Sequence, residues 1–172
     1  DSVRNQTFSD WELIVVDGGS SDGTLDIIRK IDDPRVKIHD DSGGSITTAV
    51  NKGIVSSKGD IVMPWLCADD FINASFFEST LDVFLNQSVD LTYCEWNAIV
   101  DDKVIKWREP EQGWEKKLSF GMPRIMSNTF VFRKKVFDQL GLLEEDISYA
   151  NDYEFIRRCI KANLLAKRVY NI

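Results

Sequence analysis

The sequence has no long apolar run, no basic cluster and almost no histidine, and each absence excludes a class of function. No apolar stretch approaches the roughly 18 to 20 residues that a membrane-spanning helix needs, and no signal peptide opens the chain. The 28 acidic residues outnumber the 21 basic ones, so the formal net charge is -7. Because no block of lysines and arginines offers a surface for a phosphate backbone, nucleic acid is not an expected partner.

Cysteine is scarce as well. The three cysteines, Cys67, Cys94 and Cys159, are odd in number, far apart in the chain and flanked by apolar residues. This pattern predicts reduced thiols packed in the core and no disulfide framework. Reduced thiols fit a cytoplasmic protein, and work at the inner face of a membrane would require peripheral association.

The composition is that of a folded protein. The chain has 172 residues with 43% hydrophobic content, enough to bury one core, so we expect a single domain over residues 1–172. Strand-like and helix-like patterns alternate through the first half. The predicted strands are 12–17, 36–39 and 61–67, and the predicted helices are 25–31, 46–55 and 76–85. Such alternation indicates an α/β sheet wound by right-handed crossovers.

The second half has a different pattern. Residues 91–100 and 104–108 flank an acidic turn and predict an antiparallel hairpin. Further on, the pattern predicts a strand over 129–132, a helix over 136–140 stopped by Gly141, a helix over 153–160 and a last strand over 168–172. No repeat or linker separates the two halves.

The stretch WELIVVDGGSSDGT joins the first strand to the first helix. Asp17 stands directly after the strand, where the ligand crevice of an open α/β sheet lies. Gly18 and Gly19 allow a sharp turn, and Ser20 or Ser21 can cap the helix, whose free N–H groups favour an anion. An ordinary strand-to-helix turn explains the same residues equally well.

A second pair of acids follows the third strand. Asp69 and Asp70 should emerge at the same edge of the sheet as Asp17. Two adjacent carboxylates beside a phosphate site repel each other unless a cation is present, and Mg²⁺ or Mn²⁺ prefers oxygen ligands. An acidic cap for the helix that begins near Phe76 is the alternative. Together the two acid sites suggest a metal-bound diphosphate.

Three segments resemble the family-two glycosyltransferases of the GT-A fold. They are SVRNQTFSDWELIVVDGGSSDGT, AVNKGIVSSKGDIVMPWLCADD and FVFRKKVFDQLGLLEEDISYANDYEFIRRC, and together they cover nearly the whole chain in the family's order. The resemblance implies a Rossmann-like GT-A fold: a mixed, mainly parallel sheet flanked by helices, with the antiparallel hairpin in the second half.

The resemblance also implies a donor half, residues 1–100, and an acceptor half, residues 101–172. Asp17 would contact the base of a nucleotide-sugar donor, with UDP-sugar as the family's usual choice. Asp69, with Asp70, would hold Mg²⁺ or Mn²⁺ on the donor diphosphate. The other residues implied for the donor site are Gly18, Gly19, Ser20, Asp22 and Asn51.

Asp152 matches the family's catalytic carboxylate. In inverting members this acid is the general base that takes a proton from the acceptor hydroxyl. The acceptor would be a saccharide or a lipid-linked sugar, in polysaccharide or glycoconjugate synthesis. Taken alone, Asp152 is equally a favourable charge at a helix N-terminus.

The chain departs from the family at three places. Cys67 stands where the family usually has Asp or Asn, and Asn151 stands where many members have Glu. The family's first strand, which lies between the strands of Asp17 and Asp69, is missing here, so its absence would leave central backbone groups unpaired. Two explanations stay open: the chain is a fragment of a longer protein, or another segment or another chain fills the gap. We expect the structure to show such a replacement or a rearranged sheet edge.

Two other classes of function stay open: a catalytically inactive binding module, and a sugar nucleotidyltransferase. Homo-oligomer formation is also left open.

Several residues carry weaker predictions. We expect His39 to be an exposed loop residue, and Asn51 and Lys52 to be either phosphate contacts or ordinary helix residues. Trp96, Trp107 and Trp114 are predicted to be acceptor-side or core aromatics, and Arg124 and Asn128 to be acceptor contacts.

Overall fold

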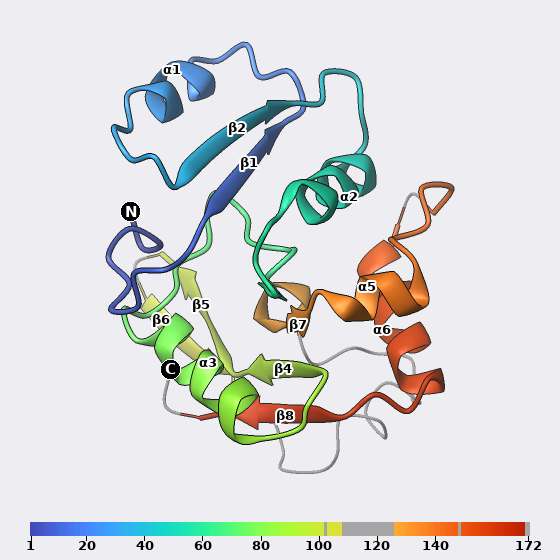
Figure 1. Cartoon of the computed structure of the whole chain (residues 1–172). Helices are drawn as coiled ribbons and strands as arrows, with labels where there is room; N and C mark the ends of the chain where they lie inside the picture. The colour runs from blue at the N-terminus through green and yellow to red at the C-terminus, as the bar shows by residue number, and fades with distance from the viewer. Residues whose placement is uncertain (102, 108–125, 148, 171–172) are drawn as a thin grey trace.

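The computed structural model describes residues 1–101, 103–107, 126–147 and 149–170. In its first part, strands β1 and β2 pair in parallel, with Leu13 opposite Val36 and Asp17 opposite Asp40. Helices α1 and α2 follow these strands (Figure 1). The bounds are β1 Leu13–Asp17, α1 Thr24–Arg29, β2 Val36–Asp40 and α2 Ile46–Ser56. The alternation of strand and helix predicted for this part is confirmed.

A four-stranded sheet forms the second structural unit, in the order β3-β7-β4-β8. β7 is antiparallel to both β3 and β4, whereas β4 and β8 run in parallel. The bounds are β3 Ile61–Val62, β4 Leu91–Cys94, β7 Val131–Arg133 and β8 Ala166–Val169. Strand β7 comes from late in the chain but inserts between β3 and β4, so the two halves share one sheet.

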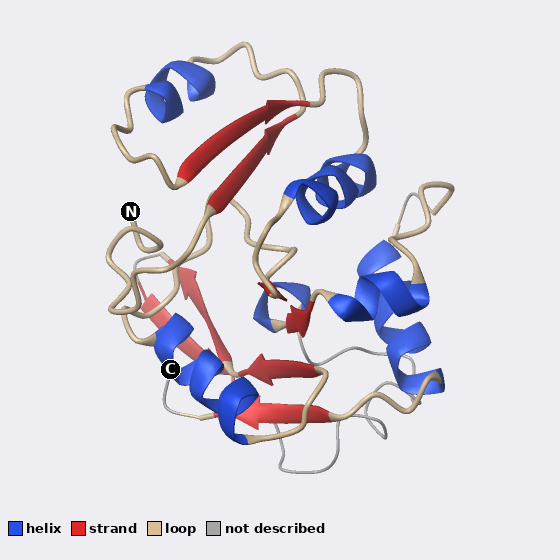
Figure 2. Cartoon of the chain, in the orientation of Figure 1, coloured by secondary structure: helices blue, strands red, loops and turns tan. Residues whose placement is uncertain are grey.

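The predicted hairpin is confirmed. β5, Trp96–Val100, and β6, Lys103–Trp107, pair antiparallel as a separate two-stranded sheet. The predicted strand over 91–100 is divided, because β4 ends at Cys94 and Glu95 separates it from β5. The hairpin thus extends beyond the four-stranded sheet (Figure 2).

Helices cover the four-stranded sheet and its margins (Figure 2). Gly141, with φ of 81°, ends α5 as predicted, because a positive φ costs glycine little. The bounds of these helices are α3 Phe76–Asn86, η1 Ser127–Thr129, α5 Lys135–Leu140 and α6 Asn151–Lys161.

The main core lies between the four-stranded sheet and helices α5 and α6. Phe132 and Phe155 are fully buried there, and the ring of Phe137 stacks on that of Phe155 with centroids 4.9 Å apart. Trp65 packs edge-on against Phe132. Each fully buried aromatic ring contributes about 1.5–3 kcal/mol to folding, so this cluster holds α6 on the sheet.

Three sequence predictions need correction. Apart from the predicted hairpin, two of the strand pairings among the described residues are parallel and two are antiparallel, so the sheets are mixed, as predicted, without being mainly parallel. Strand β3 ends at Val62, short of the predicted 61–67, because Pro64 cannot donate to a strand ladder. Cys67 is exposed, although Cys94 and Cys159 are buried as expected, and all three thiols are free.

Within the described part of the chain no segment replaces the missing strand, so that form of the expectation is wrong, and replacement by another chain stays a prediction. There, β1 pairs only with β2, and β3 pairs only with β7, so no strand joins the two sheets. Side-chain hydrogen bonds instead connect the residues before β1 to those before β3: one carboxylate oxygen of Glu12 accepts from the backbone N–H groups of Lys58 and Gly59.

Among the described helices, none is long and apolar enough to cross a membrane.

Candidate functional site

The Asp17 carboxylate closes the turn that follows β1. Its Oδ1 accepts from the N–H groups of Gly19 and Ser20, at 3.0 and 2.8 Å, and its Oδ2 accepts from the Ser20 hydroxyl at 2.7 Å. These bonds, led by that from the Ser20 hydroxyl, lower the pKa of Asp17. The carboxylate is therefore ionised at neutral pH and held in one orientation at the end of the strand.

The serines do not cap α1, which corrects the sequence prediction. Gly23, with φ of 89°, occupies the cap position and no side chain caps the helix. Asp22 instead accepts from the N–H and hydroxyl of Thr24, and the hydroxyl bond lowers the pKa of Asp22. Gly19 has φ of 100°, while the space around Gly18 is open. The backbone of this turn is thus accessible to a ligand.

Cys67, Asp69 and Asp70 come together, with one ligand atom of each lying within 4.8 Å of the others. Asp70 is braced: its Oδ2 accepts from the Cys67 N–H at 2.9 Å and its Oδ1 from Asn128 Nδ2 at 2.7 Å. Although Cys67 is exposed, neighbouring protein atoms displace part of the water around its thiol, and this desolvation and the two carboxylates raise the pKa of the thiol. The two carboxylates suit a hard divalent cation, whereas the thiol is a weaker ligand for such an ion.

Asp152 is the second residue of α6. Its Oδ1 accepts from the N–H of Tyr153 at 2.7 Å, and its charge lies at the positive end of the helix dipole. Ala150, directly before the helix, adopts the left-handed conformation with φ of 56°. The structure therefore confirms the predicted place of Asp152 at a helix N-terminus.

The first turn of α2 lies between the Asp17 turn and the start of α6. The Asp17 carbonyl accepts from the N–H of Asp41 at 2.8 Å, and the Asp41 carboxylate accepts from the Thr48 hydroxyl at 2.8 Å. The neighbouring Thr47 hydroxyl accepts from Asn151. Among the described residues no hydrogen bond or ion pair joins Asp17, Asp69 and Asp152 directly.

Two of the weaker predictions can be compared with the structure. His39 lies within β2, opposite Val16, and is half-buried, so its interpretation as an exposed loop residue was wrong. Asn51 is only 5% exposed, and its amide bonds Leu143 and Glu145. Lys52 binds the carbonyl of Asp40 and the carboxylate of Asp41.

Other weak predictions lie on the acceptor side. Trp96 is half-buried in β5, and Trp107 ends β6. Trp114 and Arg124 lie outside the described residues. Asn128 contacts Asp70, which sequence reasoning did not foresee, since no local pattern links residues 58 positions apart. Thr47 was missed for the same reason.

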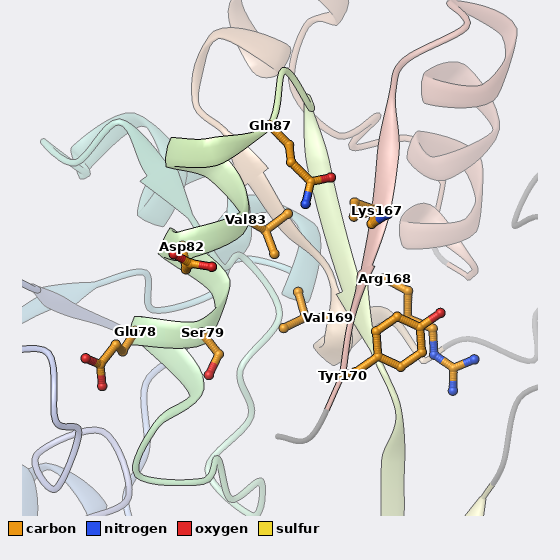
Figure 3. Close-up of a pocket in the computed structure, with 9 residues that line it drawn as sticks. All are labelled: Glu78, Ser79, Asp82, Val83, Gln87, Lys167, Arg168, Val169 and Tyr170. Carbon is orange, nitrogen blue, oxygen red and sulfur yellow. The ribbon is translucent and has the colours of Figure 1, made fainter.

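A groove of about 530 Å³ lies elsewhere, between α3 and β8 (Figure 3). Its walls carry both charges, with Glu78 and Asp82 on the helix and Lys167 and Arg168 on the strand. None of the predicted site residues lines it.

Solved structures resemble this fold. The crystal structure of residues 1–349 of S. aureus TarS in complex with UDP superposes with a TM-score of 0.70 at 20% identity, covering 90% of this chain and 47% of that one. Uncomplexed TarS 1–349 gives a TM-score of 0.71. At this identity the likeness establishes the GT-A fold alone.

Curated relatives are also similar in sequence. An uncharacterized glycosyltransferase of Rickettsia typhi (strain ATCC VR-144 / Wilmington) is 27% identical over 164 residues, which cover 90% of this chain and 51% of the relative. A PGL/p-HBAD biosynthesis glycosyltransferase of Mycobacterium tuberculosis (strain ATCC 25618 / H37Rv) is 26% identical over 184 residues, covering 100% of this chain and 67% of the relative. The chain thus spans about half the length of the first of these relatives.

The family model described as "Glycosyl transferase family 2" matches residues 1–141. This match includes the Asp17 turn, α2 and the Cys67–Asp70 group, and it covers most of the chain. The chain belongs to glycosyl transferase family 2.

Proposed function

We propose that this chain forms the donor site and catalytic base of a glycosyltransferase that moves a sugar from a nucleotide-sugar donor to an acceptor hydroxyl. The match to family 2 over residues 1–141 carries the donor-site part of the proposal, because it contains the Asp17 turn and the pair Asp69 and Asp70. The fixed, ionised carboxylate of Asp17 supports it, since such a group can accept hydrogen bonds from a base or ribose.

The donor in this proposal is a UDP-sugar. The solved TarS structure with the same fold was obtained with UDP. On this chain the turn from Gly18 to Asp22 would line the nucleotide. Gly18 has open space where a side chain would stand, which allows close approach of a ligand to the backbone.

Asp69 and Asp70 would hold Mg²⁺ or Mn²⁺, which when bound supplies positive charge to the leaving diphosphate. Asp152 would act as the general base. Its carboxylate would take the proton from the acceptor hydroxyl as that oxygen attacks the anomeric carbon, with inversion at that carbon. The acceptor would be a saccharide or a lipid-linked sugar. A cytoplasmic location, peripheral membrane contact and self-association stay predictions.

The test has two stages. Melting temperatures are measured with UDP, GDP and dTDP, each with and without Mn²⁺, since a ligand that binds the folded state raises the melting temperature. UDP release from a panel of UDP-sugars then identifies the donor. Asp152→Asn is expected to lower turnover roughly 100-fold or more while leaving stabilisation by UDP and Mn²⁺ intact.

Asp138→Asn is the matched control, because Asp138 is also an acid in the first turn of a helix, α5, and is exposed. Its turnover should equal that of the parent protein. Absence of stabilisation by every nucleotide would favour the inactive binding module. Pyrophosphate release from UTP and a sugar phosphate would favour the nucleotidyltransferase.

A further inference from the structure

Two polar residues on one face of α2 are almost fully buried. Thr47 is 3% exposed and Asn51 is 5% exposed. They are four residues apart and therefore lie one above the other on the helix. Ile54, 2% exposed, continues the same face into the main core, where Leu143 also packs. Buried polar groups are costly unless their hydrogen bonds are made, so the partners of Thr47 and Asn51 indicate what this face is for.

The Asn51 amide pairs with the segment before α6 much as a neighbouring strand would. Its Nδ2 donates to the Leu143 carbonyl at 2.9 Å, and its Oδ1 accepts from the Leu143 N–H at 3.0 Å. The same Nδ2 donates to Oε1 of Glu145 at 3.1 Å. Asn51 thereby satisfies both backbone polar groups of a buried residue 92 positions away.

The Thr47 hydroxyl binds the other end of the same segment. It accepts from Nδ2 of Asn151, the first residue of α6 and the neighbour of Asp152. Leu143 and Asn151, on either side of the described residues that lead into α6, are thus both bonded to α2. Between these bonds, Ala150 adopts a left-handed conformation that alanine rarely takes. Such a conformation persists only where the surrounding structure holds it.

α2 is well placed to connect the two parts of the molecule. No strand pairing joins the β1–β2 sheet to the four-stranded sheet among the described residues. α2 lies against β1, where Gly53 faces Val16, and Figure 1 shows the helix between the β1–β2 sheet and helices α5 and α6. Thr47 and Asn51, on the face of α2 away from that contact, carry the bonds to Asn151 and Leu143.

We propose that Asn51, assisted by Thr47, is a positioning residue that sets the start of α6, and hence Asp152, relative to the donor side of the molecule. This inference rests on the proposed function only for the catalytic role of Asp152. Asn51 acts through Leu143 and Glu145, and among the described residues it makes no hydrogen bond to Asp152.

Asn51→Asp is the most direct variant. It keeps an acceptor for the Leu143 N–H, removes both donated bonds and sets a new carboxylate against Glu145. Adding Glu145→Gln removes that repulsion and returns one donor. Asn86→Asp is the matched control, because Asn86 donates to the carbonyl and carboxylate of Asp82 in the same manner, entirely within α3.

The position of the segment is measured without any ligand. In a Cys67→Ser background, nitroxide labels are attached to Ile27→Cys on α1 and Tyr149→Cys, both at exposed sites. We expect a single narrow distance distribution for this labelled parent and for its Asn86→Asp version. Asn51→Asp should broaden the distribution, and the added Glu145→Gln should narrow it again. An unchanged distribution in Asn51→Asp would overturn the proposal.

The catalytic effect is measured on unlabelled protein with the UDP-sugar identified in the donor screen. Misplacement of the base should lower kcat roughly 10- to 100-fold with KM for the UDP-sugar changed less than about twofold, because the donor side is untouched. The double variant should recover kcat. An unchanged kcat, or a lowered kcat with unchanged label distances, would refute positioning.

Failure of the proposed function is recognised separately. It appears as no turnover in the parent protein or as full turnover in Asp152→Asn, and the label distances still test the positioning role of Asn51. If Asn51→Asp does not fold, Thr47→Ala removes only the acceptor for Asn151 and carries the same expectations for label distances and for kcat.

Discussion

Asn128 donates a 2.7 Å hydrogen bond from its Nδ2 to Oδ1 of Asp70, and this bond separates the roles of the two acids beside Cys67. Both oxygens of Asp70 are engaged, since Oδ2 accepts from the Cys67 N–H. Asp69 is exposed and accepts no hydrogen bond from the described residues. Asp70 therefore has a second role, since it braces the loop as well as offering a ligand, whereas the Asp69 carboxylate is free of other bonds within the described part of the chain.

Asp69→Asn should abolish the Mn²⁺-dependent part of stabilisation by UDP, with little change in the melting temperature of the free protein. Asp70→Asn should weaken Mn²⁺ binding and should also lower the melting temperature of the free protein, because it weakens the bonds that brace the loop. Asn128→Ala should reduce Mn²⁺ affinity roughly tenfold, as expected for a group that orients a ligand. Calorimetric titration with Mn²⁺ and thermal melts distinguish the three. If Asp69→Asn and Asp70→Asn changed the Mn²⁺ affinity and the melting temperature of the free protein by equal amounts, the two acids would not have the different roles described above.

Cys67 limits the affinity of the Cys67, Asp69 and Asp70 group for a hard divalent cation. A carboxylate at this position would add a hard oxygen ligand within the 4.8 Å cluster. Cys67→Asp should raise the affinity for Mg²⁺ and Mn²⁺ about tenfold, which corresponds to about 1.4 kcal/mol. Without metal the three clustered carboxylates repel one another, so the free variant should melt at a lower temperature.

Cys67→Ser is the control, because it removes the thiol without adding charge. Its Mn²⁺ affinity should stay close to that of the parent protein. A gain in affinity with serine as large as that with aspartate would show that loss of sulfur, and not the added charge, is responsible.

The elements that sequence reasoning placed well are those with a strong local pattern. The helix predicted over 46–55 is Ile46–Ser56, and that over 76–85 is Phe76–Asn86, because apolar residues at helical spacing need one buried face. The strand predicted over 61–67 failed at Pro64, where a local rule against proline in a strand competed with the apolar pattern.

The predictions for the site residues also succeeded for local features and failed for contacts between distant elements. Asp17 was placed correctly at the end of its strand, because strand ends are local features. The role of Ser20 was misassigned, since a serine after a strand can bond either the following helix or the preceding acid, and here it bonds Asp17. The Asn51–Leu143 and Asn128–Asp70 contacts depend on the tertiary arrangement of distant elements, so no local pattern could reveal them.

Ala150 offers a stability test beside the proposed base. Its left-handed conformation costs an alanine roughly 1–2 kcal/mol, and glycine removes that cost while giving up about 0.5–1 kcal/mol in the unfolded chain. Ala150→Gly should therefore stabilise the protein by up to about 1.5 kcal/mol. Ala49→Gly, inside α2, should instead destabilise it by about 1 kcal/mol. Chemical denaturation of both variants measures the difference, and destabilisation by Ala150→Gly would argue against this backbone conformation.

Ser20 controls the charge of Asp17. Its hydroxyl and N–H hold the pKa of Asp17 below the ordinary value, so these bonds stabilise the fold above the unfolded-state pKa and cease to do so as pH falls through the folded-state pKa. Ser20→Ala removes the hydroxyl bond alone and should raise the pKa of Asp17 toward its ordinary value. The variant should be less stable than the parent protein at neutral pH, and this difference should shrink as Asp17 becomes protonated.

Carboxyl chemical shifts of Asp17 followed by NMR titration give the pKa directly, and denaturant unfolding at neutral and acidic pH gives the stability difference. Ser21→Ala is the control, because Ser21 makes none of the three bonds to Asp17. A pKa that rises equally in both variants would mean that exposure of the turn, and not the Ser20 hydroxyl, sets the charge. A stability difference that stays constant down to acidic pH would mean that Ser20 acts independently of Asp17 ionisation, since linkage requires the difference to vanish once the carboxylate is neutral.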